Sequence, residues 1–261
     1  MHGAALYLAG FGAALGIATI ASPAGVSGAV LLLPFQVSVL GTPSPAVTPT
    51  NLLYNVIATP GALYRYWRQG QTGGRLTPVL LLGTIPGVIA GSVIRVLVLP
   101  GPHAFEIVIA VVLIPLGLWL AMHVPADGES TWRPLSAPTI VATALVVGAV
   151  GGIYGIGGGS ILAPVLIGAG RSPREVAPAT LLSTLVTSLV GVATFVLLST
   201  EHHGRITPDW GIGIAIGLGG LIGSYLGALI QPRLPEQFIR RVLGLLVATI
   251  GARYAQLAAT S

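Results

Sequence analysis

Apolar stretches separated by short loop signals divide the chain into ten segments, five in each half. Their bounds are about 4–21, 25–40, 44–66, 76–97, 103–122, 137–154, 158–170, 174–200, 207–230 and 234–256. A helix needs about 20 apolar residues to cross a bilayer, and most of the segments come close to that length. The pattern therefore predicts an all-α protein built from membrane-length helices.

The second segment of each half is shorter than a membrane crossing and follows a glycine-rich interruption. Ser22-Pro23-Ala24-Gly25 precedes the first short segment, and residues 155–159 precede the second. Glycine and proline are tolerated at membrane depth where neighbouring protein satisfies the backbone. We therefore expect segments one and two of each half to be broken or re-entrant helices whose tips reach the membrane interior. Full crossings remain the alternative.

The sequence of residues 25–82 returns at residues 155–212, displaced by 130 positions. The matching pairs include Gly25 and Gly155, Gly28 and Gly158, Pro34 and Pro164, Pro43 and Pro173, Thr50 and Thr180, and the run 74–78 with 204–208. Such a repeat in an apolar chain is typical of transporters built from two related halves. We predict an all-α integral membrane protein of two inverted-topology repeats, residues 1–122 and 137–261, joined by a linker at 123–136.

Composition places the chain in a membrane. It is 53% hydrophobic and only 7% charged, whereas soluble domains carry about 25% charge. The net charge of +5 comes with 12 arginines that are scattered singly, which argues against nucleic acid as a partner. The absence of cysteine excludes disulfides, thiolate metal sites and cysteine catalysis. The first residues lack a basic n-region, so we interpret 4–21 as a retained membrane segment.

Arginine placement predicts the orientation. If the N-terminus lies outside and all ten segments cross, nine arginines lie inside, namely Arg65, Arg68, Arg75, Arg133, Arg171, Arg174, Arg233, Arg240 and Arg241. Three lie outside, namely Arg95, Arg205 and Arg253. The excess of basic residues in cytoplasmic loops favours this arrangement, with both termini outside. Five crossings in the first half also require the second half to be inverted.

The glycine-rich interruptions are the first candidates for a binding site. Gly157, Gly158, Gly159 and Ser160 open one short helix, and Ser27 with Gly28 opens the other. First-turn N–H groups lack intrahelical partners and, with the helix dipole, favour an anion. Close helix packing through small residues is the alternative explanation. A nucleotide loop is disfavoured, because lysine and a following acidic residue are missing.

Polar side chains on the third segments are the second candidates. Asn51, Tyr54 and Asn55 lie in the first half, and Thr180 and Thr184 in the second. Their hydroxyl and amide groups can replace water around an oxyanion. Hydrogen bonding between helices is the alternative, and it is common in membrane bundles.

The remaining charged residues favour structural interpretations. Arg95 is interpreted, with Glu106 and His103, as an interfacial ion pair or a snorkelling side chain, and Glu175 as a carboxylate that complements a helix dipole. The recurring Arg75 and Arg205 favour an interface role over a role at the mouth of a pathway. His202, His203 and Glu201 lack a third spaced metal ligand. With no catalytic residue set in evidence, we predict a protein that is not an enzyme and needs no cofactor.

At the same residues the chain resembles the TauE/SafE sulfite exporter family. The resemblance rests on Gly151-Gly152, Gly155 and Gly157-Gly158-Gly159-Ser160, then Pro164, Pro173 and Ala179-Thr180, with a weaker first copy from Gly25 to Asn51. It implies a multi-pass carrier in the bacterial inner membrane for sulfite or for an organosulfonate such as sulfoacetate. Export, import, an anion channel, a non-transporting scaffold and a homodimer all stay open at this point.

Overall fold

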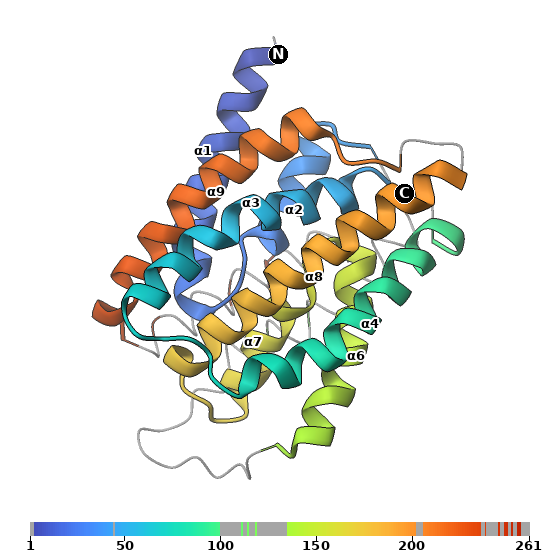
Figure 1. Ribbon diagram of the computed structural model, residues 1–261. Helices are drawn as coiled ribbons and strands as arrows, with labels where there is room; N and C mark the ends of the chain where they lie inside the picture. The colour runs from blue at the N-terminus through green and yellow to red at the C-terminus, as the bar shows by residue number, and fades with distance from the viewer. Residues whose placement is uncertain are drawn as a thin grey trace.

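The structure is a computed structural model that describes residues 3–43, 45–99, 135–201 and 206–235, together with isolated positions at 111–118 and 238–256. Every regular element in this part of the chain is helical (Figure 1). In chain order these are α1 (Gly3–Ala21), η1 (Ser22–Ala24), α2 (Ala29–Ser38), α3 (Val47–Arg68), α4 (Leu76–Leu97), α6 (Ala137–Tyr154), α7 (Gly158–Gly168), α8 (Pro173–Glu201), α9 (Trp210–Ile230) and η2 (Gln231–Arg233). The all-α prediction is confirmed.

Among the described residues, five helices are long and apolar enough to cross a membrane: 3–24, 76–97, 137–154, 173–201 and 210–233. The chain is therefore a multi-pass membrane protein. The short second segments are also confirmed, because α2 has 10 residues and α7 has 11. Most of the predicted segments 103–122 and 234–256, and most of the linker, lie outside the described residues.

Glycines interrupt the chain between the first and second helices of each half, at equivalent positions of the repeat. Gly25 ends η1 with φ of 74°, and Gly155 ends α6 with φ of 75°. Both angles lie in the left-handed region that glycine enters without steric cost. The chain then turns and starts a new helix, α2 at Ala29 and α7 at Gly158. The sequence prediction of a helix that begins at about residue 158 is confirmed.

Rows of glycine allow two helix pairs to pack backbone against backbone. Cβ atoms at Gly83, Gly87 and Gly91 of α4 would overlap the carbonyl oxygens of residues 141, 145 and 149 of α6. In the same way, Gly219, Gly223 and Gly227 of α9 lie against the carbonyls of residues 11, 15 and 19 of α1. Residue numbers rise together in each pair, so each pair runs parallel. The two contacted sets on α1 and α6 are 130 positions apart, while the glycine rows are 136 apart.

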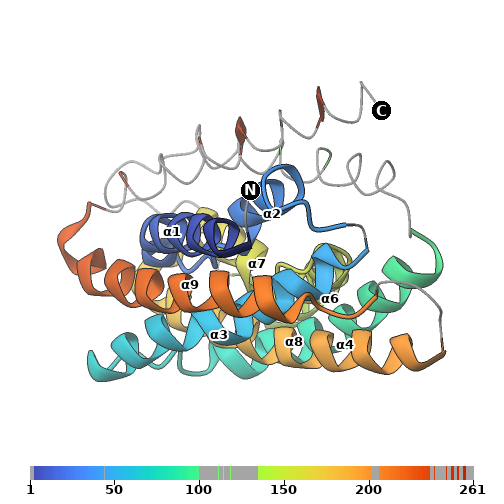
Figure 2. The same ribbon diagram turned by 90° about the horizontal axis from the view of Figure 1, so that it is seen from above.

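Contacts of α3 and α8 define the centre of the molecule. Gly213 and Gly217 of α9 pack on Leu53 and Ile57, so α3 and α9 run parallel. Between α3 and α8 the order reverses: Leu52 meets Gly191, while Tyr66 clusters with Leu181. These two helices, which occupy equivalent places in the repeat, are antiparallel. Figure 2 shows α3, α8 and α4 in one layer, with α2 and α7 on one side of it.

Candidate functional site

The two helix breaks meet at the interface between the halves. The Ser27 Oγ and Ser160 Oγ atoms are 2.9 Å apart, and the Ser27 backbone N–H donates to Ser160 Oγ at 3.4 Å. Ser160 Oγ also donates to the carbonyl of Ile156 at 2.9 Å and lies 3.5 Å from Thr184 Oγ1. Ser27 and Ser160 are 3% and 1% exposed. Residues 133 positions apart thus form one buried hydroxyl cluster.

Side chains from other parts of the fold donate hydrogen bonds to the buried backbone carbonyls of the first break. Thr180 Oγ1 of α8 lies 3.0 Å from the Gly25 carbonyl oxygen, which shares the single hydroxyl hydrogen with the Val176 carbonyl at 2.9 Å. Gln231 Nε2, just beyond α9, donates to the Pro23 carbonyl at 2.6 Å, and the Tyr66 hydroxyl donates to the Ser22 carbonyl at 3.0 Å. A broken helix leaves carbonyls such as those of Pro23 and Gly25 without intrahelical partners, while the Ser22 carbonyl also accepts the Gly25 N–H at 3.0 Å. These three bonds satisfy them in a buried setting.

The second break is bound by α3 of the opposite half. Thr48 Oγ1 donates to the Ile153 carbonyl at 3.1 Å, and Asn55 Nδ2 donates to the Gly155 carbonyl at 3.4 Å. Arg95 of α4 lies behind them, with its Nε donating to Thr48 Oγ1 at 3.3 Å and its guanidinium donating to the Leu99 carbonyl. Each half therefore binds the left-handed glycine of the other, through Thr180 in one direction and Asn55 in the other.

Each short helix also contacts the third helix of its own half. Asn51 Nδ2 donates to the Ala29 carbonyl at 3.0 Å, and Asn51 Oδ1 accepts a bond from Gln36 Nε2 at 2.7 Å. A Cβ at Gly28 would lie 2.5 Å from the Tyr54 hydroxyl oxygen, so the hydroxyl lies directly against the α2 N-terminus. These contacts fix the start of α2 against α3.

The start of α7 is held more tightly still. The Gly158 N–H donates to Thr187 Oγ1 at 3.2 Å. Cβ atoms at Gly157 and Gly158 would lie 2.8 Å from Thr184 Cγ2 and 2.6 Å from Thr84 Cγ2, and a Cβ at Gly159 would overlap the Thr180 carbonyl oxygen. The glycines therefore serve close packing, which the sequence offered as the alternative explanation. Close packing also brings the helix N-terminus to the hydroxyl cluster.

This arrangement can surround a small anion with neutral donors. The N-cap residues of α2 and α7 are Gly28 and Gly157, which have no side chains to cap these helices, although the Gly158 N–H of α7 already donates to Thr187 Oγ1. The positive ends of both helix dipoles lie beside the cluster. Serine and threonine hydroxyls can rotate to donate to an incoming oxygen atom. Within the described residues, the buried Asn55 Oδ1 and Ser188 Oγ atoms have no hydrogen-bond partner. The Ser188 hydroxyl can therefore donate to an anion, whereas Asn55 Oδ1 is an acceptor and cannot. The arrangement thus combines helix dipoles with rotatable hydroxyl donors.

All of the sequence-predicted site residues lie at these breaks or on the helix faces that touch them. They are Ser27, Gly28, Asn51, Tyr54, Asn55, Gly157, Gly158, Gly159, Ser160, Thr180 and Thr184, each described above. Their proximity is a structural fact, while their contact with substrate stays a prediction.

Sequence analysis missed three residues at the breaks, namely Gln36, Gln231 and Arg95. Gln36 lies within an apolar stretch and Gln231 directly follows one. This placement could have predicted buried hydrogen bonds from both side chains, because buried amides need partners. Arg95 is 0% exposed, which excludes a side chain that snorkels to water, while Glu106, its partner in the predicted interfacial ion pair, lies outside the described residues.

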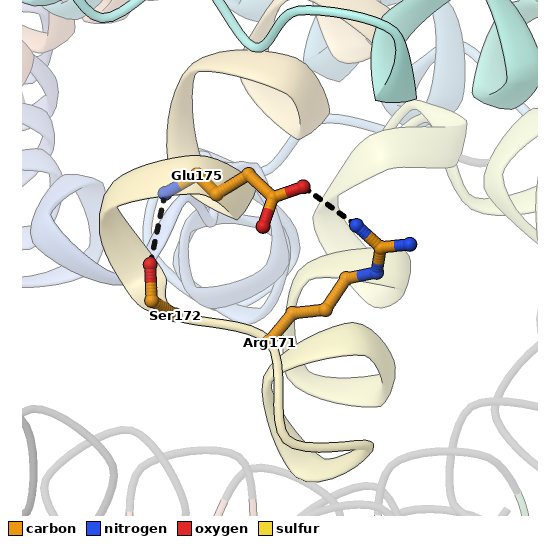
Figure 3. A network of polar contacts seen from close by, with 3 residues as sticks. All are labelled: Arg171, Ser172 and Glu175. Atoms are coloured by element: carbon orange, nitrogen blue, oxygen red, sulfur yellow. Dashed lines mark hydrogen bonds and ion pairs between the residues drawn. The ribbon is translucent and has the colours of Figure 1, made fainter. Parts of the chain in front are cut away.

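Other sequence candidates lie away from the breaks. Glu175 is in the first turn of α8, where its N–H donates to Ser172 Oγ at 3.3 Å and its carboxylate pairs with Arg171 at 2.6 Å (Figure 3). This position agrees with the predicted interaction with the helix dipole. His103, Glu106, His202, His203 and Arg205 lie outside the described residues. In the part of the chain that the structure describes, no group of three metal-ligating side chains forms.

Membrane-length helices around two buried helix breaks define a class of protein, the membrane transporters with discontinuous helices. Comparison with known proteins agrees. The family model for sulfite exporter TauE/SafE matches residues 9–254, and the chain belongs to that family of membrane transporters.

Relatives extend the comparison along the chain. A probable membrane transporter protein of Xylella fastidiosa is 29% identical over 242 residues, which cover 87% of this chain and 86% of the relative. The probable membrane transporter protein YunE of Bacillus subtilis is 25% identical over 259 residues, covering 90% and 92%. Sulfite exporter TauE/SafE family protein 2 of Arabidopsis thaliana is 36% identical over 61 residues, which are 23% of this chain and 13% of the relative.

Proposed function

We propose that the protein exports a small sulfur-containing anion, sulfite or an organosulfonate such as sulfoacetate, by alternating access around the two breaks. The observation that carries this proposal is the buried contact between Ser27 and Ser160, which joins the two helix interruptions. Substrate sites of such transporters lie where discontinuous helices meet, with helix N-termini directed at anionic groups. The family name supports sulfur oxyanions as the substrate class.

An inverted relation between the halves is part of the proposal. A two-fold axis in the membrane plane makes equivalent helices run in opposite directions. The antiparallel contact of α3 with α8, which share places in the repeat, supports that relation. The way the halves pack on each other also supports it. The fourth helix of the first half, α4, packs on the first helix of the second half, α6, and the fourth helix of the second half, α9, packs on the first helix of the first half, α1. With the arginine bias, the proposal puts both termini on the outside of the bacterial inner membrane.

In this scheme the two breaks move during transport and open the site to one side of the membrane at a time. The hydroxyl cluster is buried, so a substrate bound there would have no direct contact with water in the described conformation. Opening to one side separates one break from the third helix of the opposite half. A few polar contacts join the breaks to these helices, through Thr180 for the first break and through Thr48 and Asn55 for the second. The motion breaks these hydrogen bonds on the side that opens and keeps them on the side that stays closed.

The experiment that tests the proposal measures ligand-dependent stability. Purified protein is heated with sulfite, sulfoacetate, sulfate, taurine, phosphate, nitrate or chloride. A ligand that binds only the folded state at a hundred times its Kd stabilises it by about 2.7 kcal/mol. We expect selective stabilisation by a sulfur oxyanion, and its loss in Ser160→Ala and in Gly158→Leu.

Ser199→Ala is the matched control, because Ser199 lies exposed on α8 and bonds only within its own helix. Counter-flow in liposomes then separates a carrier from a channel, since only a carrier exchanges labelled for unlabelled substrate. Stabilisation by no anion would overturn the proposal and favour the scaffold alternative.

A further inference from the structure

A second polar region lies at one end of the bundle, away from the breaks. Loops from both halves enclose a cavity of about 390 Å³ there. The first half contributes residues 71–76, including Arg75, and the second contributes Arg171, Arg174 and Glu175. The three arginines and one carboxylate leave a formal charge of +2. Arg75 and Arg171 belong to the loops that the arginine bias places in the cytoplasm, and Arg174 and Glu175 lie in the first turn of α8 directly after one of these loops.

Three helices begin at this cavity. Leu76 opens α4, Ala137 opens α6, and Pro173 opens α8 directly between Arg171 and Arg174; the cavity lining includes Leu76, Ala137 and Arg174. In Figure 1 these three beginnings lie in the lower part of the molecule. Each helix start carries a partial positive charge of roughly half an elementary charge. Helix dipoles and arginines therefore add to a single positive field in the cavity.

One carboxylate already occupies part of this field. Glu175 pairs with Arg171 at 2.6 Å, and both side chains remain partly exposed at 49% and 29% (Figure 3). An exposed ion pair of this kind is weak and exchanges readily. An incoming oxyanion can therefore replace the Glu175 carboxylate on Arg171 at little cost.

We propose that this cavity is a cytoplasmic vestibule that binds an oxyanion before it reaches the breaks, with Arg75, Arg171 and Arg174 as ligands and Glu175 as a resident competitor for Arg171. The inference deepens the proposed function and rests on it for the identity of the anion. A concave site of one sign raises the local concentration of its substrate and its rate of association.

Transport kinetics supply the first test. In liposomes of neutral lipid, we expect the double variant Arg75→Gln with Arg174→Gln to raise KM for sulfite about three- to tenfold with Vmax nearly unchanged, since each exposed charge contributes modestly. Glu175→Gln should lower KM. The matched control is Arg68→Gln with Arg233→Gln, which removes two arginines from the same predicted side but outside the cavity lining. If the control raised KM equally, the rise would come from the general positive potential of that surface and not from the cavity, and the vestibule proposal would be overturned.

Chemical protection supplies a second test that does not depend on transport. Phenylglyoxal modifies arginine, and peptide mass spectrometry follows Arg75, Arg174 and Arg68 separately. We expect sulfoacetate to slow modification of Arg75 and Arg174 but not of Arg68, in detergent free of anionic lipid. Protection without transport would show that the cavity binds an oxyanion but would overturn both the proposed transport and the role of the cavity as a vestibule. Transport without protection would overturn the vestibule and leave the proposed function standing, and protection by phosphatidylglycerol alone would assign the cavity to a lipid headgroup.

Discussion

The two helix breaks follow the same route through the molecule but differ in backbone geometry. Both turn at a left-handed glycine, Gly25 or Gly155. Two residues later the second break uses Gly157 at φ of 69°, whereas the first break has Ser27, and no described residue other than glycine has positive φ. The comparison shows that a sequence repeat can preserve a path while each copy closes its turn differently.

The breaks also differ in the charge that lies behind them. Arg95 follows the last glycine of the α4 row by four positions, and Gln231 follows the last glycine of the α9 row by four. Gln231 donates to a carbonyl of the first break, while Arg95 donates to Thr48, which bonds to the second. Equivalent places thus hold a neutral amide in one case and a cation in the other, so we expect the second break to attract an anion more strongly.

The largest effect is expected where the two breaks differ most in packing. Gly159→Ala places a Cβ on the Thr180 carbonyl oxygen, so its cost should reach or exceed the upper end of the usual ~1–3 kcal/mol for overpacking. The equivalent residue in the first break is already alanine, Ala29, which is buried, and Ala29→Gly should cost about 1–2 kcal/mol through lost helix propensity and a lost buried methyl group. Apparent melting temperatures of both variants in detergent provide the measurement. Equal losses would show that the two breaks pack alike.

A smaller effect is expected from exchanging the residues that differ in φ. Gly157→Ser forces a side chain into a backbone region that only glycine enters freely, at a cost of about 1–3 kcal/mol. The reverse exchange, Ser27→Gly, removes the contact with Ser160 and should cost roughly 1 kcal/mol. Thermal unfolding without ligand measures both. A milder loss for Gly157→Ser than for Ser27→Gly would contradict the geometric difference between the breaks.

The smallest effect is expected on anion binding, at Arg95. Its buried guanidinium also donates to Thr48 Oγ1 and to the Leu99 carbonyl, so some loss of stability accompanies the change. Arg95→Gln copies the chemistry of the first break into the second and removes one buried positive charge. We expect about tenfold weaker anion binding, equivalent to ~1.4 kcal/mol, with partial recovery in Arg95→Lys. Titration of the ligand-dependent melting temperature gives the affinity. Unchanged affinity in Arg95→Gln would remove Arg95 from any electrostatic role at the site.

Local sequence signals were sufficient for the elements around the breaks. Gly25 and Gly155 must stand where the chain enters the left-handed region, and the short apolar runs after them determine the lengths of α2 and α7. The candidate residues were found because hydroxyls, amides and glycines are conspicuous in apolar text. The helix starts likewise depend on residues close together in sequence. The low charge is a property of composition, which the sequence states directly.

Tertiary structure decided which distant residues meet. Ser27 and Ser160 lie 133 positions apart, and only the antiparallel packing of α3 and α8 brings their breaks together. The burial of Arg95 was also decided by the tertiary structure, because a single sequence does not reveal that neighbouring helices cover its side chain. The two glycine rows are 136 positions apart, although the repeat is 130 positions long. Their equivalence is visible only from the carbonyls that they contact, which are 130 positions apart. The sequence by itself determined where this chain bends, and the packing of its two halves decided what each bend touches.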